Sequence, residues 1–254
     1  GGVGLALANW MIDGDPGADI FAMDIARFGN WATPAYTHDK VKENYARRFS
    51  IRYPNEELTE ARPLKTTPVY DRLVQAGAQF GAAWGLETAL WFAPPGVKDE
   101  FSWRRSTDFE HVAEECRAVR EQVGITEISS FAKYTIQGLG AHAWLDYILA
   151  SRIPKPGRMT LAPMLKHDGK LIGDFSLANL GDKGFFLAGS GIAEDYHMRW
   201  FSDHLPADDS VTLTAVGHGW CGLSIAGPHA REVLQSISDS DVSAQAFRFM
   251  DIRE

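Results

Sequence analysis

MLKHDGKLIGDFSLANLGDKGFFLAGSG, residues Met164 to Gly191, sets the architecture that we expect of this chain. Two glycine-containing turn signals, HDG at 167–169 and GDKG at 181–184, divide the stretch. The segments around these turns are rich in apolar residues that favour strands, namely Leu171, Ile172, Phe175, Leu177, Phe185, Phe186 and Leu187. We therefore expect a strand, a turn, a second strand, a second turn and a third strand.

Asp174 is placed inside the middle strand of this expected hairpin, not in a turn. Aspartate is depleted in strands, so its position needs a reason. One interpretation has it pointing outward from a half-exposed sheet. The other makes it a buried or cleft-facing acid that holds a cationic or amine ligand. The residues alone leave both interpretations open.

The composition restricts the function classes. A chain of 254 residues with 45% apolar and 23% charged residues indicates a globular protein of one large or two modest domains. A net charge of −8 without a basic stripe argues against a nucleic-acid partner. No apolar run approaches the roughly 20 residues that span a bilayer, so we expect no membrane partner.

Cysteine and histidine usage gives a further restriction. Cys116 and Cys221 are far apart, which argues against a disulfide framework and fits a reducing, cytoplasmic compartment. The eight histidines form no HxxxH or HExxH motif, so we expect no metal site. The chain opens on glycines without an initiator Met, and we expect it to be a piece of a longer polypeptide.

The first helix is expected from Leu5 to Ile12, and Gly14-Asp15-Pro16 ends it. It follows the glycine cluster Gly1-Gly2-Val3-Gly4. A glycine turn at a helix N-terminus presents free N–H groups to an anion or a carbonyl oxygen. The pattern GGxG is not the full GxGxxG, so a tight packing turn is an equal alternative to a ligand site.

The remaining periodicity indicates an α+β fold. Expected helices cover 38–50, 68–84, 107–123, 140–150, 194–204 and a segment beginning near 228, and expected strands cover 133–137 and 211–216. Thr107 and Glu110 have the spacing of a capping box, and Cys116 falls on the apolar face of the same helix. The cluster Arg47, Arg48, Arg52 and Arg62 is interpreted as a solvated or interdomain surface, with anion binding as the alternative.

Longer stretches resemble a known family. GVGLALANWMIDGDP and DIARF resemble the closing part of an FAD-dependent amine oxidoreductase domain. RPLKTTPVYDRLVQAGAQFGAAWGLETALWFAPPG resembles the linking region of the dimethylglycine and sarcosine dehydrogenase family. From about residue 107, the segments FEHVAEECRAVREQVGITEISSFAKYTIQGLGA, GRMTLAPMLKHDGKLIGDFSL and WCGLSIAGPHAREVLQ are similar to an aminomethyltransferase-type folate-binding domain.

This resemblance implies three parts: the end of an FAD oxidoreductase domain at 1–28, its central or linking region at 29–100, and a truncated folate-binding domain with a mixed or antiparallel sheet and flanking helices at 101–254. It implies an enzyme that oxidises an N-methylated amino acid, dimethylglycine or sarcosine, with FAD and transfers the one-carbon unit to tetrahydrofolate. The remaining polypeptide would be a partner, and the compartment the mitochondrial matrix if the source is eukaryotic.

The resemblance also assigns residues. Asp174 would face the folate amine and stabilise a cationic iminium. Gly1, Gly2 and Gly4 would approach the flavin, and Met164, Leu165 and Ser190 would line the folate cleft. Leu161 stands where family members often have Tyr, and the turn at His167 differs from theirs. These departures favour the alternative of a non-redox folate-binding or interaction module.

Overall fold

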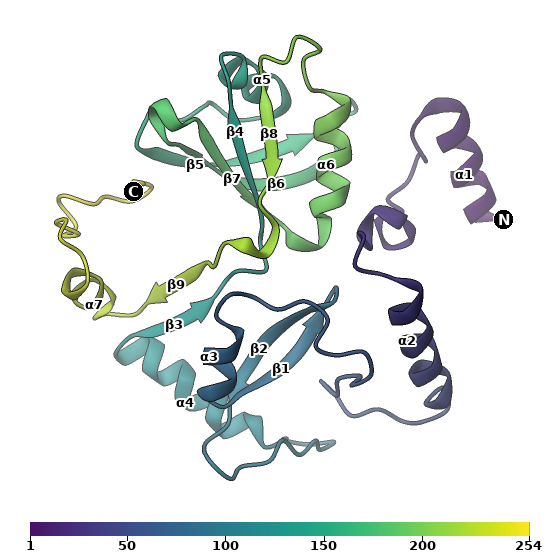
Figure 1. Ribbon diagram of the computed structural model, residues 1–254, viewed down its shortest axis with the longest axis vertical. Coiled ribbons are helices and arrows are strands. Elements are labelled where there is room, and N and C mark those ends of the chain that lie inside the picture. The colour runs from purple at the N-terminus through teal and green to yellow at the C-terminus, as the bar shows by residue number, and fades with distance from the viewer. Residues whose placement is uncertain (254) are drawn as a thin grey trace.

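The centre of the molecule is a five-stranded sheet. The computed structural model describes residues 1–253. The strand order is β5-β6-β7-β4-β8, and every neighbouring pair is antiparallel (Figure 1). The strands are β4 (Ala132–Gln137), β5 (Arg158–Leu165), β6 (Leu171–Asn179), β7 (Phe185–Gly189) and β8 (Thr212–Ala215). The expected succession of three strands and two turns is confirmed as β5, β6 and β7, so the α+β assignment with an antiparallel sheet is also confirmed.

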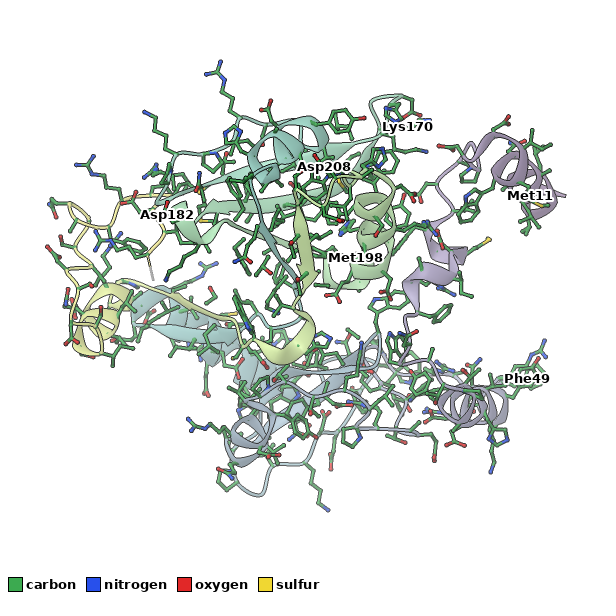
Figure 2. All side chains as sticks on the ribbon, turned by 45° about the horizontal axis from the view of Figure 1, so that its top comes forward. Met11, Phe49, Lys170, Asp182, Met198 and Asp208 are labelled. Carbon is green, nitrogen blue, oxygen red and sulfur yellow. The ribbon has the colours of Figure 1, made fainter. Side chains whose placement is uncertain are left out.

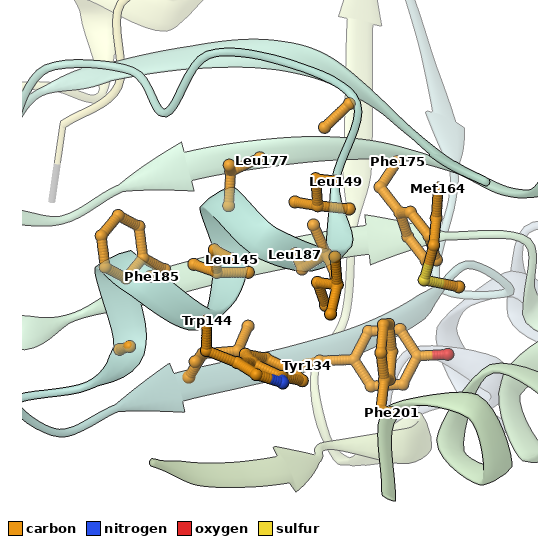
Figure 3. Close-up of a cluster of buried hydrophobic side chains, with 14 of the residues drawn as sticks. Tyr134, Trp144, Leu145, Leu149, Met164, Phe175, Leu177, Phe185, Leu187 and Phe201 are labelled. Atoms are coloured by element: carbon orange, nitrogen blue, oxygen red, sulfur yellow. The ribbon is translucent and has the colours of Figure 1, made fainter. Parts of the chain in front are cut away.

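Only one face of this sheet carries the hydrophobic core. Helices α5 (Ala141–Ile148) and α6 (Glu194–Asp203) contribute Trp144, Leu145 and Phe201 to it. Figure 3 shows these side chains meeting Tyr134, Phe175 and other strand residues. The rings of Tyr134 and Phe201 meet edge-to-face at 5.3 Å, the geometry that aromatic quadrupoles favour. The apolar face expected of the helix at 140–150 is thus confirmed.

A second group of elements lies at the opposite end of the molecule in Figure 1. It contains α3 (Tyr70–Gln75), the antiparallel hairpin β1 (Ala78–Ala83) and β2 (Leu86–Phe92), and α4 (Asp108–Glu121). The antiparallel ribbon of β3 (Gly124–Glu127) and β9 (Leu223–Ala226) leads from this group toward the C-terminal helix α7 (Ala230–Ser236). The ribbon therefore joins chain segments about 100 residues apart.

The N-terminal segment runs along one side of both groups (Figure 1). It contains α1 (Gly2–Asp13), the short 3-10 turns η1 (Phe21–Met23) and η2 (Ile25–Arg27), and α2 (Pro34–Ala46). Gly14 closes α1 with a φ of 72°, as the Gly-Asp-Pro signal predicts. Helix α1 contains no buried residue. No helix among residues 1–253 has the length and apolarity required to cross a membrane.

The prediction of one helix over 68–84 is wrong. The helix ends at Gln75 and β1 follows it. Gly77 has a φ of 89°, and its carbonyl accepts a hydrogen bond of 2.9 Å from the Ala93 N–H beyond β2. The hairpin supplies partners across its two strands, and these non-local bonds override the local helical pattern.

Two details of the predicted helix at 107–123 are also wrong. The Thr107 side chain makes no capping bond to α4, and its hydroxyl lies 3.3 Å from the Glu100 carbonyl oxygen instead. Cys116 is exposed, and α4 contains no buried residue. The amphipathic pattern thus located the helix but overstated its burial.

Candidate functional site

Asp174 lies in the middle of β6, with its side chain exposed on the face of the sheet that the core helices leave open. Its neighbours Gly173 and Phe175 are buried, as strand alternation requires. Pro163 of β5 is its direct partner. The pair Ser176↔Ala188 fixes the register with β7, and continuing it by two residues places Ser190 opposite Asp174 on the other side.

The surroundings of Asp174 combine a free carboxylate with apolar surface. Within residues 1–253 its carboxylate has no hydrogen-bond or ion-pair partner, so all of its acceptor positions are open. Leu161, which pairs with Ser176, is 60% exposed, and Leu165 of the same strand is also exposed. On β7, Phe186 stacks on the exposed Trp220 with ring centroids 5.8 Å apart. Such a surface suits a flat ligand with an amine.

The residues predicted to line the folate cleft therefore lie on two different faces of the sheet. Leu165 and Ser190 are exposed close to Asp174 in the strand register. Met164 is fully buried in the core and pairs with Gly173, so it lies on the opposite face of the sheet. This corrects the expectation for Met164: strand alternation makes it a packing residue that cannot share a surface with Asp174.

The support behind Asp174 was not visible in the sequence pattern. The ring of Phe175 lies against Gly173 and Gly189, where a Cβ atom would come within 2.5 Å of it. His197 of α6 packs on the same ring at a centroid distance of 4.8 Å, and its Nδ1 lies 3.3 Å from the Tyr134 hydroxyl. Burial lowers the pKa of His197 to about 4, so the imidazole is neutral near pH 7.

The glycines at the N-terminus lie away from this site. Gly1 caps α1, and Gly2 and Gly4 form its first turn (Figure 2 labels Met11 on the same helix). Apart from adjacent residues and the backbone of α1 itself, no described atom lies within 4 Å of a Cβ built on any of these three glycines. Among residues 1–253, the helix end thus has no second wall that would enclose a flavin. Binding of the flavin by these glycines stays a prediction.

The arginine cluster divides into two environments. Arg47 pairs with Glu56, and Arg52 donates to the Asn44 side chain at 2.8 Å. A surface pocket of about 440 Å³ adjoins them, lined by Asn44, Tyr45, Arg47, Arg48, Ser50 and Arg52. Arg62 is separate, because its partly buried guanidinium pairs with the buried carboxylate of Glu87. Among residues 1–253, no three His, Cys, Asp or Glu side chains form a group that could hold a metal ion.

The comparisons with known proteins divide the chain in two. A family described as the FAD dependent oxidoreductase central domain matches residues 13–67, and one described as the GCVT N-terminal domain matches residues 69–254. The expected division at residues 28 and 100 stays a prediction.

Several curated relatives match the whole chain. Mitochondrial dimethylglycine dehydrogenase of Homo sapiens is 31% identical over 257 residues, which cover 100% of this chain and 30% of that protein. The mitochondrial pyruvate dehydrogenase phosphatase regulatory subunit of Mus musculus is 28% identical over 264 residues, with the same two coverages. The chain thus spans about 30% of the length of these relatives.

A solved structure shares the fold of the larger part. The glycine cleavage system aminomethyltransferase T from Bartonella henselae superposes with a TM-score of 0.60 at 22% sequence identity, and covers 74% of this chain and 46% of that one. Because the family match over residues 69–254 includes the whole sheet and Asp174, the chain belongs to the GCVT N-terminal domain family.

Proposed function

We propose that this chain is part of an FAD- and folate-linked dehydrogenase, which oxidises an N-methylated glycine and transfers the one-carbon unit to tetrahydrofolate. The single observation that carries the proposal is the unpartnered, exposed carboxylate of Asp174 on the open face of a GCVT-family sheet. The order of the two matched regions and the similarity to dimethylglycine dehydrogenase support it. Because the human dimethylglycine dehydrogenase and the mouse phosphatase regulatory subunit are both named as mitochondrial, we propose the mitochondrial matrix if the source is eukaryotic.

The residues of the open face have distinct roles in this proposal. Tetrahydrofolate, when bound, supplies the amine that takes up the one-carbon unit. The Asp174 carboxylate accepts a hydrogen bond from that amine and takes its proton at Oδ as the new bond forms. Its negative charge also stabilises a cationic iminium donor. Leu161 and Leu165 provide apolar surface beside the carboxylate, and Ser190 offers a hydroxyl opposite it.

A second candidate function is a non-redox folate-binding or interaction module. The observation in its favour is the match of the whole chain to a protein named as a regulatory subunit. Leu161, at a position where the family resemblance leads us to expect an aromatic residue, points the same way. This candidate keeps the open face as a binding surface but gives Asp174 no chemistry.

The test is made on the full-length parent. Tetrahydrofolate binding is measured by calorimetry for wild type, Asp174→Asn and Asp174→Ala, and free formaldehyde and amine oxidation are assayed in parallel. We expect oxidation to be intact and capture of the one-carbon unit to fall by on the order of 100-fold, a usual value for a lost acid–base group. Formaldehyde should accumulate in its place.

Asp146→Asn is the matched control, because Asp146 is exposed on α5, the helix on the opposite face of the sheet. It should leave capture unchanged. A wild-type parent that binds no folate would remove the one-carbon function and favour the second candidate. Folate binding with full capture in Asp174→Asn would show that Asp174 is not the transfer residue.

A further inference from the structure

One ion pair joins the N-terminal segment to helix α6. The Arg199 guanidinium donates to Asp24 Oδ1 at 3.2 Å and to Asp24 Oδ2 at 2.6 Å, which is the bidentate geometry that gives directional strength. Asp24 is only 3% exposed, and its Oδ1 also accepts the Ala26 N–H at 2.9 Å. The bonds from Arg199 and Ala26 outweigh burial and lower the pKa of Asp24, so this carboxylate stays charged.

Aromatic side chains hold the same arginine from both segments. The guanidinium carbon lies 5.2 Å from the ring centroid of Trp10 on α1 and 5.3 Å from that of Tyr196 on α6. Phe21 of η1 contacts Tyr196 edge-to-face at 5.3 Å. Since the Trp10–Arg199 and Phe21–Tyr196 contacts each join the two segments, the junction is specific in orientation as well as in charge.

A second ion pair joins the two segments next to the strand of Asp174. Lys166, at the start of the turn between β5 and β6, pairs with Asp15 just beyond α1. Figure 2 labels Lys170 in this turn, on the side of the sheet nearest the N-terminal segment. The Lys166 N–H donates to the Lys170 carbonyl at 2.8 Å, which closes the turn that leads into β6.

Helix α6 transmits the position of Arg199 to β6. Two residues before Arg199, His197 turns to the opposite side and packs on Phe175, the residue that follows Asp174. Phe201 packs on the same ring at 5.8 Å. The contact between the segments and the support of Asp174 therefore lie on one rigid helix, since packed interiors move as units.

We propose that the Asp24–Arg199 and Asp15–Lys166 pairs hold the open face of the folate domain in register with the FAD-linked part, so that Arg199 is a positioning residue for one-carbon transfer. The inference rests on the proposed function. Asp15 and Asp24 fall in the region matched by the FAD oxidoreductase family, and Lys166 and Arg199 in the region matched by the GCVT family. Both pairs thus cross between the two parts.

The experiment compares coupling with each half-reaction in the full-length parent. The variants are Arg199→Met, Asp24→Asn, Lys166→Met and the conservative Arg199→Lys. Amine oxidation, tetrahydrofolate affinity and the ratio of captured to free one-carbon units are measured. We expect the ratio to fall on the order of 10- to 100-fold in Arg199→Met, because an ångström-scale misplacement costs that much. Oxidation and folate affinity should stay within about twofold, and Arg199→Lys should recover part of the ratio.

Arg158→Met is the matched control, since Arg158 pairs with Asp251 entirely within the GCVT-matched region. An unchanged ratio in Arg199→Met and Lys166→Met would overturn the inference. If the capture ratio, amine oxidation and folate affinity all fell together, the ion pairs would have only a structural role, and the inference would be overturned. If Arg199→Met does not fold, the same three measurements on Lys166→Met give the answer. A wild-type parent that captures no one-carbon unit would remove the proposed function as well, so the two failures are distinguishable.

Discussion

Asp174 and His197 differ in burial. Asp174 is part of β6, and His197 packs against the neighbouring Phe175 of the same strand. The carboxylate is exposed and unpartnered within residues 1–253, whereas the imidazole is 2% exposed and contacts Phe175 and Tyr134. A buried imidazole without a carboxylate partner favours its neutral form. This residue therefore contributes a pH dependence to the stability of the fold.

The pH dependence of unfolding follows from the depressed pKa of His197. It is about 4 in the folded chain and near 6.5 when unfolded, so the unfolded chain binds more protons between these values. The free energy of unfolding should therefore fall as pH drops from 6.5 to 4, by roughly 3 kcal/mol from this group. Urea unfolding of the parent at several pH values measures it.

His197→Gln should flatten that dependence between pH 5 and 6.5, above the range in which the carboxylates titrate. The control His38→Gln should not change it, because His38 is exposed on α2. An equal slope in wild type and His197→Gln would contradict the assignment.

At the residue scale, the sequence correctly places Asp174 inside a strand but does not show which face of its strand Met164 occupies. Asp174 is an exception to strand composition, so its presence in β6 is visible without a structure. Whether Met164 faces the core depends on which face of β5 is buried. In the structure, the buried face is the one that carries Ala162 and Met164. That choice is made by α5 and α6, which the sequence of β5 does not contain.

Single elements are predicted well where their contacts are local. Helix α5 and the three strands β5, β6 and β7 need only periodicity and nearby turns. The segment 68–84 fails because β1 gains its partners from β2, after the turn at Gly85. The glycines that surround Phe175 also escape prediction, because Gly189 reaches the ring only after β6 and β7 have paired.

Gly189→Ala tests this packing at the level of the hairpin. A Cβ at Gly189 would lie 2.5 Å from the Phe175 ring, so the ring must shift or the strands must separate. We expect the free energy of unfolding to fall by about 1–3 kcal/mol, as overpacking in a core does. Gly219→Ala, where no atom lies within 4 Å, should change it by less than about 0.5 kcal/mol. Equal melting curves for the two variants would refute the crowding.

The stability of the whole molecule depends on contacts between its two matched regions, and these contacts could not be predicted from the sequence. Arg62 comes before the junction of these regions and Glu87 after it. Arg62 Nε and Nη2 donate to the Glu87 carboxylate at 2.9 and 2.6 Å, and Nη2 also donates to the Phe80 carbonyl at 2.9 Å. Of the predicted solvated or interdomain surface, Arg62 therefore fits the interdomain description and not the solvated one.

Removing this arginine should destabilise the junction. Arg62→Met leaves Glu87, which is 4% exposed, as an uncompensated buried charge, and we expect a loss of about 3–5 kcal/mol in the free energy of unfolding. Arg105→Met is the control, because the Arg105–Glu110 pair is 70% and 72% exposed and should cost less than about 1 kcal/mol. Chemical denaturation of the parent gives both values, and a similar small loss for Arg62→Met would argue against a buried pair.

The position of β4 in the sheet has a consequence for synthesis of the chain. This strand is made before β5, β6 and β7, yet it pairs only with β7 and β8. While β5, β6 and β7 can form successive hairpins as they emerge, β4 keeps both backbone edges unpaired until residue 185 arrives on one side and residue 212 on the other. Long-range pairing of this kind slows folding, and open strand edges attract other chains. A nascent chain that pauses between these two points is therefore the form most in need of a chaperone.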